Sequence, residues 1–392
     1  MNTATDQEWL AAFRRRMAQQ RIPVSGILEL TSSCNLKCVH CYLGPQEEQR
    51  KKRALEMDSE QAEAVIDELV AAGCLNLTIT GGDPMVRKDF PRIYRYAKEQ
   101  GLLVTVFCDG ILVTDTIVRL FQEYPPTKVD ISVYGATPET YERVTRVPGS
   151  FPKFLRGLDR LRDGGIPYSL KTVLMSINKH ELDAMRAMAA ERGVGFRMDS
   201  AIFPCLPNND HEPLDLRVDP KEAVDLELSD PEQLQHWVDY VDRMGPVKPS
   251  ENLYTCGAGV TNFYVDPMGF ASPCLMTTHY RYSIEEHGFE ALWGDQLVQL
   301  RSKKPREAYG CNTCEKQVVC NGCPAFNQLE NGAEDVKSDY VCETTQHRWE
   351  AIQAARQDAE TALAEDAETR RQARRAALKP RGDSLLPIVN TP

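Results

Sequence analysis

The sequence predicts an α/β protein in which a partial (β/α)6 barrel of the TIM type is followed by a small cysteine-rich α+β domain and a C-terminal helix. Six short apolar segments typical of strands alternate with helix-like segments between residues 24 and 203. Repeated β-α units form parallel strands joined by right-handed crossovers, and six such units predict an open barrel. Seven of the thirteen cysteines then lie between Cys256 and Cys342, which indicates a second unit.

Strands are expected where apolar and β-branched residues run between turn signals, and helices where apolar residues recur at helical spacing behind a capping residue. A helix at 5–22 comes first, within an N-terminal segment at 1–23. The barrel strands are expected at 27–31, 75–80, 103–107, 128–133, 168–173 and 195–198, and the barrel helices at 58–72, 89–100, 114–124, from 138, from 151, and at 180–192.

The regular alternation ends near Pro204. We interpret residues 204–250, with their clusters of Pro, Asn and Asp and one helix at 231–244, as a bridging segment. The cysteine-rich domain is expected at 251–345 and includes a hairpin at 262–272 with its turn at 266–269. Residues 346–392 predict a solvated helix to about residue 378 and then a mobile end.

Composition argues against several classes of function. The formal charge of −11 argues against a nucleic-acid surface. There is no run of eighteen apolar residues and the first residues are polar, so neither membrane insertion nor export is expected, and we expect the chain in the cytoplasm. An odd number of cysteines without an export signal fits a disulfide framework poorly, so metal clusters explain them better.

The first cysteine group follows the first predicted strand, and β/α barrels carry their working groups on the loops at that end. Cys34, Cys38 and Cys41 have the spacing Cys-x3-Cys-x2-Cys. A [4Fe-4S] cluster normally takes four cysteines, so three thiolates leave one iron open to a non-protein ligand. A structural zinc site is the alternative, but such sites take cysteine pairs with a second pair elsewhere.

This spacing resembles that of radical S-adenosylmethionine (SAM) enzymes, and the resemblance covers about residues 24–345. After the second strand, Gly81-Gly82-Asp83-Pro84 is similar to the Gly-Gly-Glu-Pro motif of that family, which binds the amino group of SAM. Asp83 replaces the usual Glu and keeps its charge. Considered alone, the same four residues form an ordinary turn.

The resemblance also implies contacts to the nucleoside part of SAM. Asp109 ends the third strand and Ser132 ends the fourth, where relatives contact the ribose, and His40 lies where relatives often have an aromatic residue near the adenine. Without the resemblance, Ser132 is simply a hydroxyl at a strand end.

The second cysteine group resembles the SPASM extension found on many radical SAM enzymes, which usually holds two auxiliary iron-sulfur clusters. Carried over, the resemblance assigns three cysteines to one cluster and four to another, namely Cys256, Cys274 and Cys323, and Cys311, Cys314, Cys320 and Cys342. Cys320 and Cys323 are separated by two residues rather than the usual three, and the first auxiliary cluster lacks a fourth cysteine. We therefore expect one or two auxiliary clusters. A pair of zinc knuckles is the alternative.

The resemblance implies that an electron from the reduced cluster cleaves SAM to a 5'-deoxyadenosyl radical, which takes a hydrogen atom from the substrate. A ribosomally synthesised peptide is the expected substrate, for crosslinking or oxidation. A tetrapyrrole, a haem precursor or another small molecule is the alternative substrate, and a non-catalytic iron-sulfur redox protein is the alternative outside enzymology. No residue is singled out for proton transfer.

The expected partners are a reductant such as flavodoxin or ferredoxin and a separate leader-peptide-binding protein. Fewer than thirty residues precede the first strand, so a leader would need either that separate protein or direct capture by the barrel. Folding of residues 250–345 is expected to depend on metal occupancy.

Overall fold

The computed structural model describes residues 6–206, 210–247, 249–306 and 309–377. Its strands are β1 Ser25–Glu29, β2 Asn76–Thr80, β3 Leu103–Cys108, β4 Lys128–Ser132, β5 Tyr168–Val173, β6 Phe196–Asp199, β7 Asn262–Val265, β8 Phe270–Ser272 and β9 Tyr282–Ser283. Its helices are α1 Asp6–Gln20, α2 Gln46–Lys52, α3 Ser59–Ala71, α4 Phe90–Glu99, α5 Asp115–Glu123, α6 Pro138–Thr145, α7 Ser150–Asp163, α8 Leu182–Glu191, α9 Pro220–Leu228, α10 Pro231–Met244, α11 Ile284–His287, α12 Phe289–Ala291, α13 Pro324–Asn331 and α14 Asp339–Ala377.

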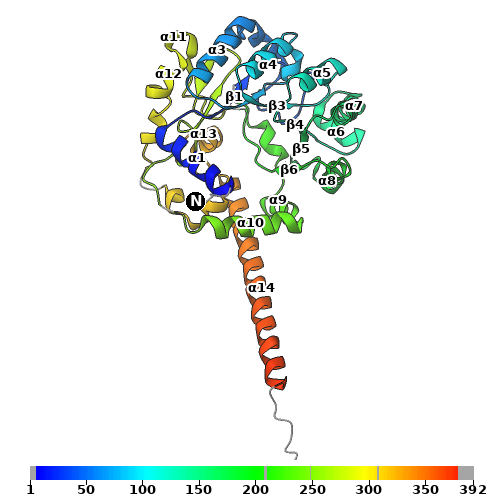
Figure 1. The fold of residues 1–392 in the computed structure, drawn as a ribbon, viewed down its shortest axis with the longest axis vertical. Helices are drawn as coiled ribbons and strands as arrows, with labels where there is room; N and C mark the ends of the chain where they lie inside the picture. The colour runs from blue at the N-terminus through cyan, green and yellow to red at the C-terminus, as the bar shows by residue number, and fades with distance from the viewer. Residues whose placement is uncertain (1–5, 207–209, 248, 307–308, 378–392) are drawn as a thin grey trace, which may run out of the picture.

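The predicted fold class is confirmed. Strands β1 to β6 are parallel and lie side by side in chain order, with helices α3 to α8 around their outer side (Figure 1). Helix α14 projects far from the body of the molecule (Figure 1). No helix among the described residues has the length and apolar character needed to cross a bilayer.

The cysteine-rich region is continuous with the barrel through the sheet. Strand β7 pairs in parallel with β1, and β8 and β9 follow it in antiparallel fashion, so the sheet has the order β6-β5-β4-β3-β2-β1-β7-β8-β9. The predicted hairpin is present as β7 and β8, with its turn stabilised by two N–H groups, of Met268 and Phe270, that donate to Asp266 Oδ1. The edge of the barrel at β1 is therefore covered by a strand from the C-terminal half of the chain.

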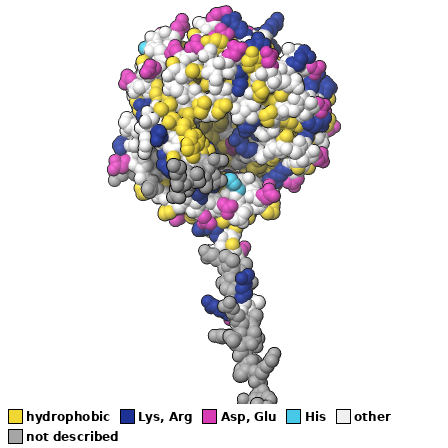
Figure 2. Space-filling view, viewed as in Figure 1, with side chains coloured by type: hydrophobic (Ala, Val, Ile, Leu, Met, Phe, Trp, Pro, Cys, Tyr) yellow, Lys and Arg dark blue, Asp and Glu magenta, His cyan; other side chains and the backbone are white. Residues whose placement is uncertain are grey.

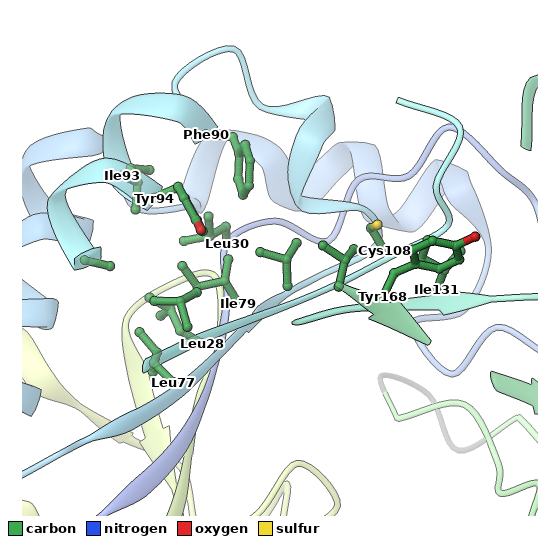
Figure 3. Packing of buried hydrophobic residues seen from close by; sticks show 14 of the residues in the cluster. Leu28, Leu30, Leu77, Ile79, Phe90, Ile93, Tyr94, Cys108, Ile131 and Tyr168 are labelled. Atoms are coloured by element: carbon green, nitrogen blue, oxygen red, sulfur yellow. The ribbon is translucent and has the colours of Figure 1, made fainter. Parts of the chain in front are cut away.

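Alternate residues of each barrel strand are buried against the outer helices, as the period of two in a strand requires. Leu28, Leu77 and Ile79 join one buried cluster with Phe90 and Tyr94 of α4 (Figure 3). This packing sets the register of the strands, because a slip by one residue would turn the apolar set to the opposite face.

The intervening residues face the inside of the barrel. They include Glu29 of β1, Ser132 of β4 and Lys171 of β5, so the inner face is largely polar. The space-filling view shows a hollow near the centre of the molecule, with hydrophobic side chains along one margin and Lys and Arg side chains along the other (Figure 2).

Capping residues explain several helix starts. Asp58 and Gln61 form the reciprocal capping box of α3, with the Gln61 N–H 2.8 Å from Asp58 Oδ1, and Thr114 caps α5. Ser338 accepts a hydrogen bond from the Val341 N–H at 3.3 Å, which explains why α14 begins at Asp339 rather than near residue 346.

Two further boundaries differ from the expected ones. Strand β1 ends at Glu29, two residues early, because its partner β2 ends at Thr80 and pairs with Glu29. The segment at 204–250 contains a second helix, α9, which Asp219 caps ahead of Pro220. The expected mobile end at 379–392 lies outside the described residues.

Candidate functional site

The cysteine loop after β1 is held by side chains from two neighbouring segments. Glu56 Oε1 accepts hydrogen bonds from the Thr31 hydroxyl at 3.0 Å and from the Ser32 N–H at 2.8 Å. Gln46 Nε2 donates to the Cys34 carbonyl at 3.0 Å. The backbone that presents the three thiols is therefore fixed by contacts made outside the loop itself.

Hydrogen-bond donors are directed at the sulfur atoms of this loop. The Leu36 N–H lies 3.3 Å from Cys34 Sγ, and Gln49 Nε2 lies 3.7 Å from Cys41 Sγ. Burial, and then the charge of Cys41, raises the pKa of Cys38, so the thiolate form there requires a bound cation. Buried thiols that receive hydrogen bonds suit an iron-sulfur cluster.

The surroundings of the loop also fit a polar ligand. Among the described residues, Ser33 Oγ, Asn35 Oδ1 and His40 Nδ1 are buried without hydrogen-bond partners. A cavity of about 260 Å³ borders the loop, and Cys38 and Cys41 contribute to its lining. Among the described residues, no group of three His, Cys, Asp or Glu side chains is arranged to hold a single metal ion.

The Gly-Gly turn after β2 lies directly against the cysteine loop. The Gly82 N–H donates to the Thr31 carbonyl at 2.8 Å and the Asp83 N–H to the Ser33 carbonyl at 3.0 Å. A Cβ at Gly81 would lie 2.3 Å from the Thr31 oxygen, and one at Gly82 would lie 2.3 Å from the Ser33 oxygen. Glycine is required at both positions because two backbone segments meet there.

Asp83 and Asp109 form a buried pair between β2 and β3. The two Asp83 carboxylate oxygens accept the N–H groups of Met85 and Asp109, both at 2.9 Å. Asp109 in turn accepts from Asn35 Nδ2 at 2.8 Å and from the Ile111 N–H at 2.8 Å. Burial raises the pKa of both carboxyl groups. The Asp83 side chain thus anchors the turn to β3 and links it through Asp109 to the cysteine loop.

Tyr134 is a site residue that sequence analysis does not identify. Its ring meets the His40 ring edge to face, with 4.9 Å between centroids and 68° between planes. Its side chain also lies near those of Ser132 and Cys38. Ser132 and His40, which are separated by 92 residues in the sequence, are therefore brought to one place by Tyr134. An aromatic residue two positions beyond a strand-end serine is the only signal that the sequence offers.

The C-terminal cysteines fall into two groups in space. Burial raises the pKa of Cys323 to about 12, and the nearby Cys274 and Cys256 add to the shift. The Phe326 N–H, at the start of α13, donates to Cys323 Sγ at 3.3 Å. These three cysteines are those that the resemblance assigns to one auxiliary cluster.

The second group is centred on Cys311. Burial raises its pKa, and the nearby Cys320, Cys314 and Cys342 raise it further. Lys337 Nζ lies 3.5 Å from Cys342 Sγ at the start of α14. The structure therefore brings together the four cysteines expected for the other cluster, and their binding of iron stays a prediction. All thirteen cysteines are free, and Cys74, Cys108 and Cys205, which belong to none of these groups, are buried.

Residues 28–189 match the family model of the radical SAM superfamily. The chain contains a radical SAM domain. The cofactors of a radical SAM enzyme of this type are a [4Fe-4S] cluster and SAM, with auxiliary clusters besides, and the cysteines that would hold the auxiliary clusters stay predictions.

Two curated relatives each match about three quarters of this chain. An AdoMet-dependent heme synthase of Methanosarcina barkeri is 26% identical over 328 residues, which span 76% of this chain and 90% of that protein. The mycofactocin maturase MftC of Mycolicibacterium smegmatis is 25% identical over 318 residues, which span 76% of this chain and 77% of that protein.

Solved structures share the fold of the radical SAM domain and of the region after it. SuiB of Streptococcus suis bound to S-adenosylmethionine superimposes with a TM-score of 0.60 at 14% identity, over 87% of this chain and 82% of that one. The structure of anSMEcpe with bound AdoMet has a TM-score of 0.62 at 15% identity, over 84% of this chain and 98% of that one.

Proposed function

We propose that this radical SAM enzyme modifies a ribosomally synthesised peptide, by oxidation or by forming a crosslink. The junction between the cysteine loop and the Gly81–Asp83 turn, within residues that match the superfamily, carries the proposal of a SAM site. The peptide substrate is supported by the likeness to the maturase MftC and by the fold shared with SuiB bound to its precursor peptide SuiA, at a TM-score of 0.62.

When bound, the cluster and SAM supply the one-electron chemistry that removes a hydrogen atom from an unactivated carbon. Cys34, Cys38 and Cys41 would hold the cluster. The carbonyls of Gly81 and Gly82 accept no hydrogen bond from other described residues, so they are suited to receive an ammonium group of SAM.

The other residues of the site would bind and orient the nucleoside. Asp109 and Ser132, at the ends of β3 and β4, are suited to the ribose hydroxyls, and His40 and Tyr134 present ring faces and edges to the base. The surrounding barrel would exclude water from the reacting carbon.

A tetrapyrrole substrate is the second candidate, because the match to the heme synthase of Methanosarcina barkeri spans 90% of that relative. We further propose that the protein works in the cytoplasm with a reductant such as flavodoxin or ferredoxin, and that a separate leader-peptide-binding protein presents the peptide.

The enzyme class is tested by anaerobic reconstitution with iron and sulfide, followed by SAM and dithionite. We expect 5'-deoxyadenosine from the wild-type chain and from Cys74→Ala, which removes a buried thiol outside the cysteine groups, and none from Cys38→Ala. Nucleoside release that persists in Cys38→Ala would refute the proposed SAM site.

The substrate class is tested with the same reconstituted enzyme. Short precursor peptides encoded beside the gene are compared with coproporphyrin III, and products are followed by mass spectrometry. A mass change in the peptide supports peptide maturation, whereas a mass change in the porphyrin alone would favour a tetrapyrrole substrate.

A further inference from the structure

Two cationic side chains lie next to each other on the inner face of the barrel. Lys171 of β5 and Arg197 of β6 are paired residues of neighbouring parallel strands. Leu170, Phe196 and Met198, which flank them, pack with the outer core, so Lys171 and Arg197 face the inside. Like charges directly opposite on neighbouring strands are destabilising without a counter-ion.

Among the described residues the pair has no directly bound counter-ion, although the charges of Asp130 and Asp199 act on Lys171 from a greater distance. No carboxylate there forms an ion pair with Lys171 or Arg197, and Lys171 Nζ instead lies 3.8 Å from the centre of the Phe107 ring on β3. Asp130 of β4 accepts the Ser169 hydroxyl at 2.5 Å and pairs with Lys128 at 2.9 Å.

The remaining acidic neighbour is also engaged. Asp199 accepts the Ala201 N–H at 2.9 Å. Burial, followed by the charge of Arg197, lowers the pKa of Lys171, whereas the charges of Asp130 and Asp199 oppose this shift. Arg197 is exposed and Lys171 is half-buried, so a ligand can reach both.

The position of this pair relates it to the SAM site. Lys171 is the register partner of Ser132, the β4 residue proposed to contact the ribose. An anion held by Lys171 and Arg197 would therefore lie one strand away from the nucleoside, at the same height in the barrel. A substrate group next to the reacting carbon must be held in this position for that carbon to lie beside SAM.

We propose that Lys171 and Arg197 bind a carboxylate of the peptide substrate and so place its reacting carbon beside SAM. This inference rests on the proposed peptide-modifying function. The overall charge of −11 makes non-specific attraction of an acidic peptide unfavourable, so its binding would report on a local cationic site.

The test measures binding directly and needs no turnover. Reconstituted full-length enzyme is titrated anaerobically with N-acetyl-tetraglutamate amide, and with the tetraglutamine amide, by isothermal titration calorimetry. We expect the glutamate peptide to bind and the glutamine peptide not to bind. Lys171→Met and Arg197→Met should each weaken binding at least about tenfold, equivalent to about 1.4 kcal/mol, whereas Lys171→Arg should retain it. Lys153→Met, which removes the same charge from the exposed side of α7, is the matched control and should bind like the wild type.

Three results would overturn the inference. The first is an affinity for the glutamate peptide that is undetectable in the wild type or equal in all variants. The second is a parallel loss of SAM affinity in Lys171→Met, measured by equilibrium dialysis, which would assign the pair to the carboxylate of SAM. The third is binding of coproporphyrin III through these residues without binding of the peptide.

A failure of the proposed function gives a different result from a failure of this inference. In that case neither 5'-deoxyadenosine nor a modified peptide is formed, while charge-dependent binding of the peptide persists.

Discussion

At the scale of single residues, the Asp83 carboxylate illustrates how one side chain connects several segments. It is fully buried, and both of its oxygens accept backbone N–H groups, from Met85 and from Asp109. Its charge therefore acts on the protein backbone, whereas the carbonyls of Gly81 and Gly82 accept no hydrogen bond from other described residues. Loss of this carboxylate should damage the shape of the turn as well as the binding of SAM.

We expect Asp83→Ala to lower the free energy of unfolding by about 2–4 kcal/mol, because it leaves two buried N–H groups without acceptors. Asp83→Asn retains one carbonyl oxygen and should lie between Asp83→Ala and the wild type. Chemical denaturation measures the stability, and equilibrium dialysis measures SAM affinity. If Asp83→Ala has unchanged stability and loses only SAM affinity, the side chain acts on the ligand directly.

Glu29 is a buried acid on the inner face of the barrel, and it accepts the Tyr42 hydroxyl at 2.5 Å. Burial raises its pKa to about 7, and the charge of Asp266 adds to this, whereas hydrogen bonds from Tyr42 and Tyr264 and the charge of Lys52 oppose it. The folded state therefore holds a proton that the unfolded state releases near pH 4.3. The resulting stability is present below about pH 4 and is lost as the pH rises through about 7.

Between pH 5 and pH 8 the ionisation of Glu29 should lower the free energy of unfolding by about 2–3 kcal/mol. A glutamine at this position cannot ionise. Over the same pH range, the free energy of unfolding of Glu29→Gln should therefore fall by about 2–3 kcal/mol less than that of the wild type. Denaturant titrations of both proteins at the two pH values measure the difference. Equal pH dependence in the two proteins would mean that Glu29 is already ionised at pH 5.

At the scale of elements, the loop after β1 and the turn after β2 act as one unit because their backbones touch. Gly82→Ala places a Cβ 2.3 Å from the Ser33 oxygen, so the two segments must separate. We expect SAM affinity to fall at least about tenfold, since the groups proposed to bind SAM are divided between the segments. Gly195→Ala is the control, because its nearest neighbour would lie 3.9 Å from the new Cβ. The same SAM affinity in both variants, measured by equilibrium dialysis, would contradict this account.

The cysteine-rich region contains two kinds of element. Strands β7 and β8 are hydrogen-bonded into the barrel sheet, whereas residues 310–323 carry four cysteines and contain only two short 3-10 turns, Gly310–Thr313 and Glu315–Val319. Stability of the turns should therefore depend on metal, and stability of the hairpin should not.

We expect removal of iron by a chelator to increase hydrogen exchange at 310–323 and to leave 262–272 protected. Hydrogen-exchange mass spectrometry of the apo and reconstituted proteins measures both segments at once. Equal protection of 310–323 in the two preparations would contradict metal-coupled folding, and simultaneous loss at 262–272 would show that the hairpin also requires metal.

At the scale of the whole molecule, the ring of Phe263 joins the two halves of the chain. It lies on β7 against Gly26 of β1, where a Cβ would come within 2.1 Å of the ring, and its centroid is 4.8 Å from that of Phe289. The barrel and the strands added to its edge therefore share one core.

Phe263→Ala should lower the free energy of unfolding by about 3–5 kcal/mol, as for other large buried aromatic residues. Because the core is shared, the loss should appear in the barrel as well as in the hairpin. Trp293, one of four tryptophans, packs near Phe263, so its fluorescence is followed in a variant in which the other three are replaced by Phe, and far-UV circular dichroism follows the barrel. Coincident midpoints are expected, and destabilisation confined to the fluorescence transition would contradict a shared core.

Local patterns were sufficient for much of this architecture. The alternation of strand and helix signals predicted the six parallel strands, and the Asp58 capping residue predicted the start of α3, because both depend on residues close together in the chain. The spacing of Cys34, Cys38 and Cys41 indicated the cluster chemistry for the same reason.

The sequence by itself determined the order of the elements, the cysteine motifs and hence the class of chemistry. Only the tertiary structure decided that β7 extends the sheet at β1, that Tyr134 connects His40 with Ser132, and that Lys171 and Arg197 lie side by side with no ion pair to a carboxylate in the described part of the chain. These features depend on which distant segments come into contact. That choice is made by the packing of the whole core, which no short stretch of sequence specifies.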